Sequence, residues 1–213
     1  MQQKDILMIF TKNLVYGRVK TRLAATIGDQ SAFEVYKALI AHTYSVTRPL
    51  HIDKAIFYDS YIEQDDAGTE GFQKLVQQGN DLGERMSNAF AQVLADGYEK
   101  AVVIGADCPE LDEAILKKAF ELLNRHDVVI GPAADGGYYL LGIKKLYAGL
   151  FTGISWSSPA AFDETIGKCK AYGLSIAQLP VLHDVDYESD LRYIRPATAR
   201  QNDDYDQRHH SNI

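Results

Sequence analysis

The sequence predicts a single-domain, three-layer α/β/α sandwich built on a mostly parallel sheet. Short apolar segments alternate along the chain with longer segments whose apolar residues recur every three or four positions. The longer segments have the length of helices that cross over between parallel strands, which covers both faces of a sheet. The 213 residues suit one large domain, and neither an internal repeat nor a linker divides them.

Seven apolar segments are predicted as strands. Residues 6–10 are apolar throughout, as expected for a strand buried on both faces, and residues 101–104 form the clearest strand because Gly105 ends them. The others are residues 55–58, 72–77, 128–130, 138–143 and 176–179.

Four segments with helical periodicity lie between these strands. Residues 31–46 follow Asp29, a candidate cap, and residues 82–94 and 112–123 show the same periodicity. Ser158 followed by Pro159 predicts the start of a helix that runs to about Tyr172. The domain is expected to span residues 1–196, and the polar residues 197–213 are expected to form a poorly ordered tail.

Composition excludes several classes of protein. Lys and Arg number 22 against 29 Asp and Glu, a net charge of −7, which argues against a general nucleic-acid or membrane-surface binder. Cys108 and Cys169 are too few for a disulfide framework, so a cytoplasmic protein is expected. The apolar run at residues 6–10 is too short for a signal peptide or a membrane span. Oligomeric state is not predicted.

The loop after the first predicted strand is a candidate phosphate site. Lys12 and Gly17 precede the cations Arg18, Lys20 and Arg22. Glycine lets a backbone approach a ligand, while lysine and arginine supply charge and donors. The sequence is no P-loop, because valine stands where that motif needs glycine. A solvated basic segment at the start of a helix is the alternative, although cations there oppose the helix dipole.

Acidic residues follow two other predicted strands. Asp107 lies in a loop bounded by Gly105 and Pro109, where its carboxylate would hold a hard cation or only cap the next helix. Asp184-Val185-Asp186 follows the last strand. Because ligands bind outside the carboxyl ends of parallel strands, these carboxylates are expected to share one crevice.

A glycine-rich turn lies between them. Asp135-Gly136-Gly137-Tyr138 would let a backbone run close to a bound sugar or base, although Asp-Gly is also a strong hairpin signal. Trp156 lies in a loop beside Ser157, either as a stacking platform or as part of the core. Gly83 and Arg85 lie in a polar helix start that capping alone would explain.

Taken in order, these motifs resemble a bacterial family of transferases labelled radical-SAM/selenodomain-associated or arsenosugar-biosynthesis glycosyltransferases. The resemblance covers residues 6–191 and rests on Val19-Lys20-Thr21-Arg22-Leu23 after Gly17, Asp81-Leu82-Gly83-Glu84-Arg85-Met86, Gly105-Ala106-Asp107-Cys108-Pro109, Asp135-Gly136-Gly137-Tyr138, Trp156-Ser157 and Asp184-Val185-Asp186. That family is similar to the nucleotide-diphospho-sugar transferases, which have the glycosyltransferase A fold.

The resemblance implies a role for each group of residues. Mg²⁺ or Mn²⁺ would bind Asp107 and Asp186, with Asp184 the alternative to Asp186, and the catalytic residues would be Asp107, Asp135 and Lys20. The nucleotide would contact Lys12, Gly17, Lys20, Thr21, Arg22, Gly83, Arg85, Gly105 and Ala106. The transferred sugar or the acceptor would contact Asp135, Gly136, Gly137, Tyr138, Trp156 and Ser157.

Three functions fit this pattern. The first is a metal-dependent glycosyltransferase that uses a nucleotide-sugar donor and a small-molecule acceptor. The second is a nucleotidylyltransferase that transfers NMP from an NTP to a phospho-acid or sugar phosphate and releases pyrophosphate. The basic first loop favours the second, because a triphosphate requires more cationic donors than a diphosphate, whereas the family label favours the first. The third is a non-catalytic nucleotide-binding protein.

Overall fold

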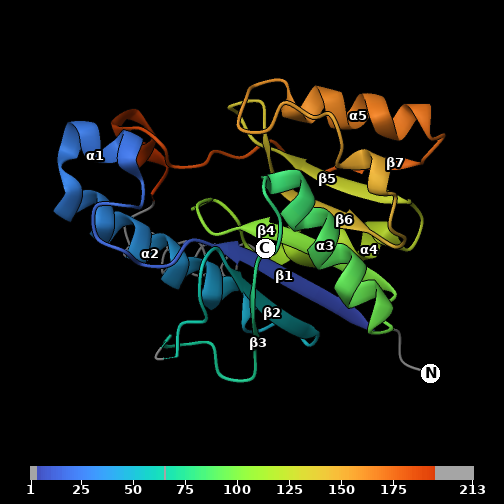
Figure 1. Ribbon diagram of the computed structural model, residues 1–213, viewed down its shortest axis with the longest axis horizontal. Helices are drawn as coiled ribbons and strands as arrows, with labels where there is room; N and C mark the ends of the chain where they lie inside the picture. The colour runs from blue at the N-terminus through green and yellow to red at the C-terminus, as the bar shows by residue number, and fades with distance from the viewer. Residues whose placement is uncertain (1–3, 65, 195–213) are drawn as a thin grey trace, which may run out of the picture.

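The computed structural model describes residues 4–64 and 66–194, and these contain one seven-stranded sheet (Figure 1). The strand order is β3-β2-β1-β4-β6-β5-β7. Only β6 runs antiparallel to its neighbours, β4 and β5, so the mostly parallel sheet is confirmed. The strands are β1 (Asp5–Thr11), β2 (Asp53–Tyr58), β3 (Gln73–Val76), β4 (Lys100–Gly105), β5 (Val128–Pro132), β6 (Tyr138–Ile143) and β7 (Ile176–Gln178).

Helices cover both faces of the sheet, which confirms the three-layer architecture (Figure 1). Helices α2 (Asp29–Thr47) and α4 (Glu113–Leu123) pack on one face, and α3 (Leu82–Ala95) and α5 (Ala161–Ala171) pack on the other. Two short 3₁₀ helices, η1 (Ala148–Leu150) and η2 (Glu188–Tyr193), follow β6 and β7, respectively.

The central strand β1 shows why the sheet is covered on both sides. Successive side chains of a strand point to opposite faces. Leu7 and Ile9 pack toward α2 and α4, whereas Ile6 and Met8 pack toward α3 and α5, and all four are fully buried. An apolar run of this kind holds the sheet between two helical layers and leaves only its ends for polar chemistry.

The start of the helical region after the first loop differs from the expectation. A separate helix, α1 (Thr21–Ile27), precedes α2, and Gly28 joins the two with a φ of 83°. The prediction that Asp29 caps α2 is therefore wrong. Asp29 is the first residue of the helix, where its negative charge interacts favourably with the positive end of the helix dipole.

The predicted start of α5 is also wrong. The helix begins at Ala161 rather than at Pro159 and ends at Ala171. The carbonyl of Gly136 accepts the N–H of Phe162 at 3.0 Å. The turn between β5 and β6 therefore satisfies one of the first donors of the helix, while Ser158 forms a separate turn by accepting from the N–H of Ala160 at 3.2 Å.

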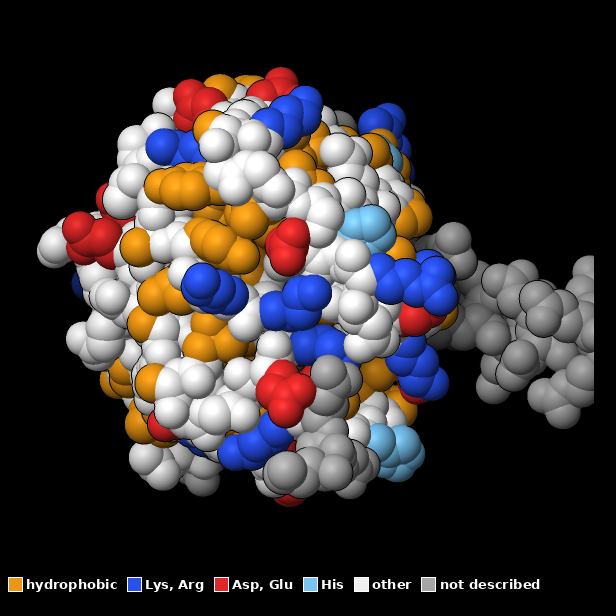
Figure 2. Space-filling model, turned by 90° about the vertical axis from the view of Figure 1, so that its right-hand side faces the viewer, with side chains coloured by type: hydrophobic (Ala, Val, Ile, Leu, Met, Phe, Trp, Pro, Cys, Tyr) orange, Lys and Arg blue, Asp and Glu red, His pale blue; other side chains and the backbone are white. Residues whose placement is uncertain are grey.

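The remaining expectations concern the surface and the end of the chain. The domain boundary at residue 196 and the predicted tail, residues 197–213, lie outside the described residues. None of the helices in the described segments is long and apolar enough to cross a membrane. On the face where β1 begins, Lys and Arg side chains are interspersed with acidic and hydrophobic ones (Figure 2).

Candidate active site

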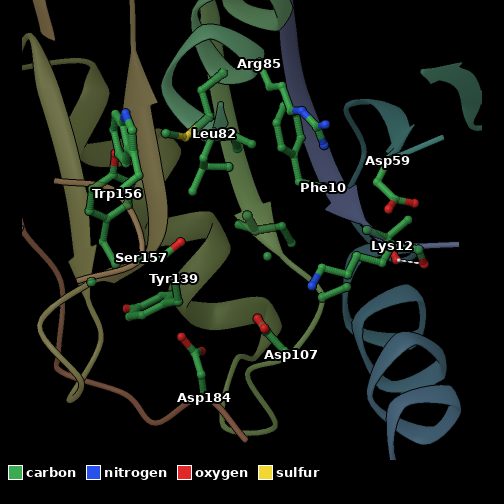
Figure 3. A pocket seen from close by; sticks show the side chains of 18 of the residues that line it. Phe10, Lys12, Asp59, Leu82, Arg85, Asp107, Tyr139, Trp156, Ser157 and Asp184 are labelled. Carbon is green, nitrogen blue, oxygen red and sulfur yellow. Dashed lines mark hydrogen bonds between the residues drawn. The ribbon is translucent and has the colours of Figure 1, made fainter. Parts of the chain in front are cut away.

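A cavity of about 700 Å³ opens at the carboxyl ends of β1 and β4, where the topology predicts a ligand site (Figure 3). Most of the residues singled out in the sequence line it. These are Lys12, Lys20, Thr21, Arg22, Arg85, Gly105, Ala106, Asp107, Asp135, Gly137, Tyr138, Trp156, Ser157, Asp184 and Asp186.

Three of the predicted glycines lie outside the cavity lining. Gly17 lies in the first loop with a φ of 71°. Gly83 packs against the Trp156 ring, so a Cβ there would collide with the indole. Gly136 has a φ of 90° and packs against the backbone of Pro159. Gly83 and Gly136 therefore hold the walls of the cavity in place rather than lining it.

The centre of the site is the side chain of Lys20, which lies between two carboxylates. Its Nζ is 3.0 Å from Asp107 Oδ2 and 3.0 Å from Asp186 Oδ1, and only 6% of the side chain is exposed. Arg22 contacts the other oxygen of Asp186 at 3.1 Å. The chain thus brings together two carboxylates that are distant in sequence, and it does so around a cation.

The backbone at Lys20 is unusual for a residue with a side chain. Its φ is 48°, in the left-handed region, and it is the N-cap of α1 without a side-chain capping bond. Left-handed conformations disfavour residues other than glycine by about 1–2 kcal/mol. Such strain is found where surrounding structure fixes a functional group, and here it turns the ammonium toward Asp107.

The charges of this cluster shift the pKa values of its members. Burial alone would lower the pKa of Lys20, but the carboxylates of Asp107 and Asp186 outweigh burial and raise it above 10.5. Burial alone would raise the pKa of Asp186, but Lys20 and Arg22 outweigh burial and lower it below 3.8. Lys20 and Asp186 are therefore both charged at neutral pH.

Asp184 behaves in the opposite way. Its Oδ1 is buried, and no hydrogen bond to it is found in the described part of the chain. Burial and the nearby charge of Asp107 raise the pKa of Asp184 well above 3.8, against the effect of Lys20. An unsatisfied buried carboxylate oxygen is costly to a fold, so this atom marks a place for a ligand or cation.

The carboxylates of the site are of the type that binds a hard divalent cation, but they are too few to hold one without further ligands. Carboxylate oxygens are the ligands that Mg²⁺ and Mn²⁺ prefer, and Asp107 and Asp186 already surround a positive charge. However, no group of three or more His, Cys, Asp or Glu side chains within residues 4–64 and 66–194 is arranged to hold a metal ion. The site therefore fits a metal that shares itself between one or two carboxylates and substrate phosphates.

The opposite wall of the cavity is acidic and aromatic. The β5–β6 turn is a hairpin turn, and Asp135 Oδ1 accepts the N–H of Gly137 at 2.8 Å. The rings of Tyr138 and Trp156 pack edge to face with centroids 6.3 Å apart. Ser157 has a φ of 60°, and its side chain points into the cavity (Figure 3).

Several lining residues were not predicted from the sequence, among them Phe10, Tyr36, Asp59 and Gln77. Asp59 and Gln77 directly follow β2 and β3, so the rule that located Asp107 applies to them as well. They were missed because they belong to no recognised motif. Tyr36 looks like an ordinary core residue of α2, yet its hydroxyl accepts the N–H of Lys12 at 2.9 Å.

The chain matches one protein-family model. Residues 43–158 match the model of a family described as uncharacterised proteins conserved in bacteria, DUF2064. The chain belongs to this family. The matched segment contains Asp59, Gln77, Asp107 and Asp135, so it includes part of each wall of the cavity. No match was found among curated proteins.

Solved structures extend the comparison to nearly the whole chain. A proposed nucleotide-diphospho-sugar transferase from Desulfovibrio desulfuricans G20 is 30% identical, with a TM-score of 0.81 over 97% of this chain and 98% of that one. A CMP-2-keto-3-deoxy-manno-octonic acid synthetase complexed with CTP is 11% identical, with a TM-score of 0.57 over 93% and 100%.

A third structure carries a metal and a nucleotide. Glucosyl-3-phosphoglycerate synthase from Mycobacterium tuberculosis, in complex with Mn²⁺, UDP and glucosyl-3-phosphoglycerate, is 11% identical, with a TM-score of 0.54 over 94% of this chain and 75% of that one. These structures confirm the expected nucleotide-diphospho-sugar transferase fold.

Proposed function

We propose that this protein is a metal-dependent glycosyltransferase that uses a nucleotide-sugar donor. The fold supports a transferase that acts on a nucleotide-activated substrate, because the similar structures include a proposed nucleotide-sugar transferase and a nucleotidyltransferase bound to CTP. The choice between these two classes rests on how charge is distributed in the cavity.

The observation that carries the proposal is that the two walls of the cavity differ. All four lysine and arginine side chains among its described lining residues come from the loop after β1, from the start of α1 or from α3. These are Lys12, Lys20, Arg22 and Arg85. The wall formed by Asp135, Tyr138, Trp156 and Ser157 carries no Lys or Arg among its described residues.

This asymmetry supports an uncharged transferred group. Carboxylates accept hydrogen bonds from sugar hydroxyls, and aromatic rings cover the apolar face of a sugar. A phosphorylated acceptor placed against Asp135 would instead bring two negative charges together in a partly enclosed site. We therefore assign the basic wall to the nucleoside diphosphate, with its phosphates at Lys12, Lys20 and Arg22, and the acidic, aromatic wall to the sugar and its acceptor.

Catalysis would consist mainly of positioning and charge stabilisation. Asp107 and Asp186 would hold Mg²⁺ or Mn²⁺, which when bound neutralises the negative charge that develops on the departing diphosphate. Lys20 and Arg22 would donate hydrogen bonds to the diphosphate oxygens. Asp135 would face the sugar or the acceptor hydroxyl.

The second candidate is nucleotidyl transfer with release of pyrophosphate. The four cations of the basic wall favour it, because they provide more positive charge than a diphosphate requires. Under this reading the acidic wall would still have to accept a phosphorylated acceptor, and that conflict makes it the weaker candidate.

One experiment separates the two candidates. The purified protein is incubated with Mn²⁺ or Mg²⁺ and either a panel of NDP-sugars or a panel of NTPs with sugar phosphates and phospho-acids. We expect metal-dependent release of NDP from one NDP-sugar and no pyrophosphate from any NTP. Pyrophosphate formation would contradict glycosyl transfer. Nucleotide binding that neither requires metal nor leads to turnover would indicate the non-catalytic alternative.

A further inference from the structure

One end of the cavity is built from the carboxyl ends of β1 and β2 together with α3. Phe10, Asp59 and Arg85 line it, and in Figure 3 they lie across the cavity from Trp156 and Ser157. Under the proposed function, the phosphates lie along Lys12 and Lys20 and the sugar lies at the Trp156 wall. The base of the nucleotide then occupies the end of the cavity that Phe10, Asp59 and Arg85 line.

The carboxylate of Asp59 is fixed before any ligand arrives. Its Oδ1 accepts the backbone N–H of Asn13 at 2.7 Å. The Asn13 side chain holds the same loop, because its Oδ1 accepts the N–H groups of Ser60 and Tyr61 at 3.2 Å and its Nδ2 donates to the carbonyl of Tyr61 at 2.9 Å. Asp59 is therefore a positioned acceptor rather than a mobile surface charge.

Both oxygens of this carboxylate can accept hydrogen bonds from a ligand, because Oδ1 uses only one of its two acceptor sites on the N–H of Asn13. Within the described part of the chain, Asp59 Oδ2 takes part in no hydrogen bond or ion pair, and Asp59 lines the cavity. An ionised carboxylate only accepts hydrogen bonds. The group that occupies this end must therefore present N–H or O–H donors to Asp59.

Flat groups accompany this acceptor. The Phe10 ring packs against Phe57 at a centroid distance of 5.4 Å and borders the cavity. The Arg85 guanidinium is held in place by Nε, which donates to the carbonyl of Gly79 at 3.1 Å, and by a 3.4 Å contact from its NH1 to Gln77 Oε1. Aromatic rings and guanidinium planes are the surfaces on which bases stack.

The four bases differ in what they offer to a carboxylate. Guanine presents two adjacent donors, N1–H and the N2 amino group. Uracil presents one N–H between two carbonyl oxygens, and adenine and cytosine each present an amino group beside a ring nitrogen acceptor. Only guanine can place one donor on each oxygen of a carboxylate without placing an acceptor against either oxygen. Hydrogen bonds of this kind are charge-assisted and are among the strong ones.

We propose that the nucleotide carries guanine and that Asp59 is the residue that selects it, by accepting from N1–H and N2–H. This inference rests on the proposed function. It makes the donor a GDP-sugar.

The test is equilibrium binding of GDP, UDP, ADP and CDP to the full chain by calorimetry, with Mn²⁺ present. We expect GDP to bind about tenfold more tightly than the others, a ratio that corresponds to about 1.4 kcal/mol. Asp59→Asn keeps an oxygen to accept from Asn13 but presents an amide donor. We expect it to lose the preference for GDP and to bind xanthosine diphosphate, whose C2 carbonyl accepts from that amide, more tightly than GDP.

Asp112→Asn is the matched control. Asp112 caps α4 by accepting the N–H of Ile115 at 2.8 Å, and it lies outside the described lining of the cavity. Asparagine caps a helix as well as aspartate does, so this variant makes the same change of charge and should keep the GDP preference.

The outcomes separate the two proposals. If no nucleoside diphosphate binds with or without metal, the proposed function itself is wrong. If diphosphates bind but GDP is not preferred, or if Asp59→Asn leaves the order of the bases unchanged, only the assignment of guanine to Asp59 is overturned. Melting curves of both variants exclude unfolding as the cause of lost binding.

Discussion

The Lys20 ammonium lies 3.0 Å from the Asp107 carboxylate, and the same nitrogen lies 3.0 Å from Asp186. The chain thus places its own positive charge where two carboxylates would otherwise repel each other. A divalent cation that binds Asp107 and Asp186 has to compete with this ammonium. For the metal to bind both carboxylates, the Lys20 ammonium has to leave them, and the nucleotide phosphates would provide it with another anionic partner.

Replacing Lys20 by methionine should tighten the binding of metal alone. Without the ammonium, Asp107 and Asp186 no longer have a competing cation, so we expect the affinity for Mn²⁺ in the absence of nucleotide to rise about tenfold, which corresponds to about 1.4 kcal/mol. Binding of a nucleoside diphosphate should weaken in the same variant. Titration followed by electron paramagnetic resonance measures the first effect, and unchanged or weaker Mn²⁺ binding would argue against the competition.

Replacing Asp107 by asparagine should abolish turnover without changing the fold. The Asp107 side chain is 37% exposed, so the loss of its charge should change the free energy of unfolding by no more than about 1 kcal/mol. Loss of an electrostatic contact to the transition state typically reduces turnover by about 100-fold or more. Melting temperature and product release are measured on the same sample. A variant that keeps both its stability and its activity would refute the assignment of metal to Asp107.

Asp184 should make the fold less stable at neutral pH. Because its pKa in the folded protein is raised above 3.8, stability is lost as pH rises from 3.8 through the folded value. Asp184→Asn removes this effect, so we expect the free energy of unfolding to increase at neutral pH and to change less in acid. Denaturant unfolding at two pH values provides the measurement. An equal gain at both would show that ionisation of Asp184 is not the cause.

The ion pairs of Lys20 have the opposite dependence on pH. The lowered pKa of Asp186 gives stability that is present above 3.8 and lost as pH falls through the folded value. The raised pKa of Lys20 gives stability that is present below 10.5 and lost only as pH rises beyond it. We therefore expect the difference in unfolding free energy between the wild type and Asp186→Asn to be largest between these limits. A difference that is constant from acid to alkaline pH would contradict this.

Ser157 allows backbone strain to be separated from function. Its φ of 60° lies in the left-handed region, and this backbone conformation costs residues other than glycine about 1–2 kcal/mol. We expect Ser157→Gly to be about 1 kcal/mol more stable than Ser157→Ala, while both variants raise the KM for the donor because both lose the hydroxyl. If the two variants bind the donor like the wild type, the hydroxyl has no part in binding.

The strands and the basic loop could be predicted from the sequence because they depend on local patterns. Apolar runs such as Ile6–Ile9 can lie only between two covered faces, and the strand-end rule then brings Asp107 and Asp186 to one crevice. The pairing of both carboxylates with Lys20 could not be predicted, because it depends on the left-handed backbone at that residue. The start of α5 was missed because the carbonyl of Gly136, a tertiary contact, satisfies its first turn.

The most direct test of the account is the effect of Mn²⁺ on nucleotide binding. A nucleoside diphosphate is titrated into the wild type and into Asp186→Asn by calorimetry, each with and without Mn²⁺. If Asp186 helps to hold the metal that meets the diphosphate, Mn²⁺ should tighten binding about tenfold in the wild type, or about 1.4 kcal/mol, and have little effect in the variant. An equal effect of Mn²⁺ in both proteins would contradict the assignment of the metal to this pair of carboxylates.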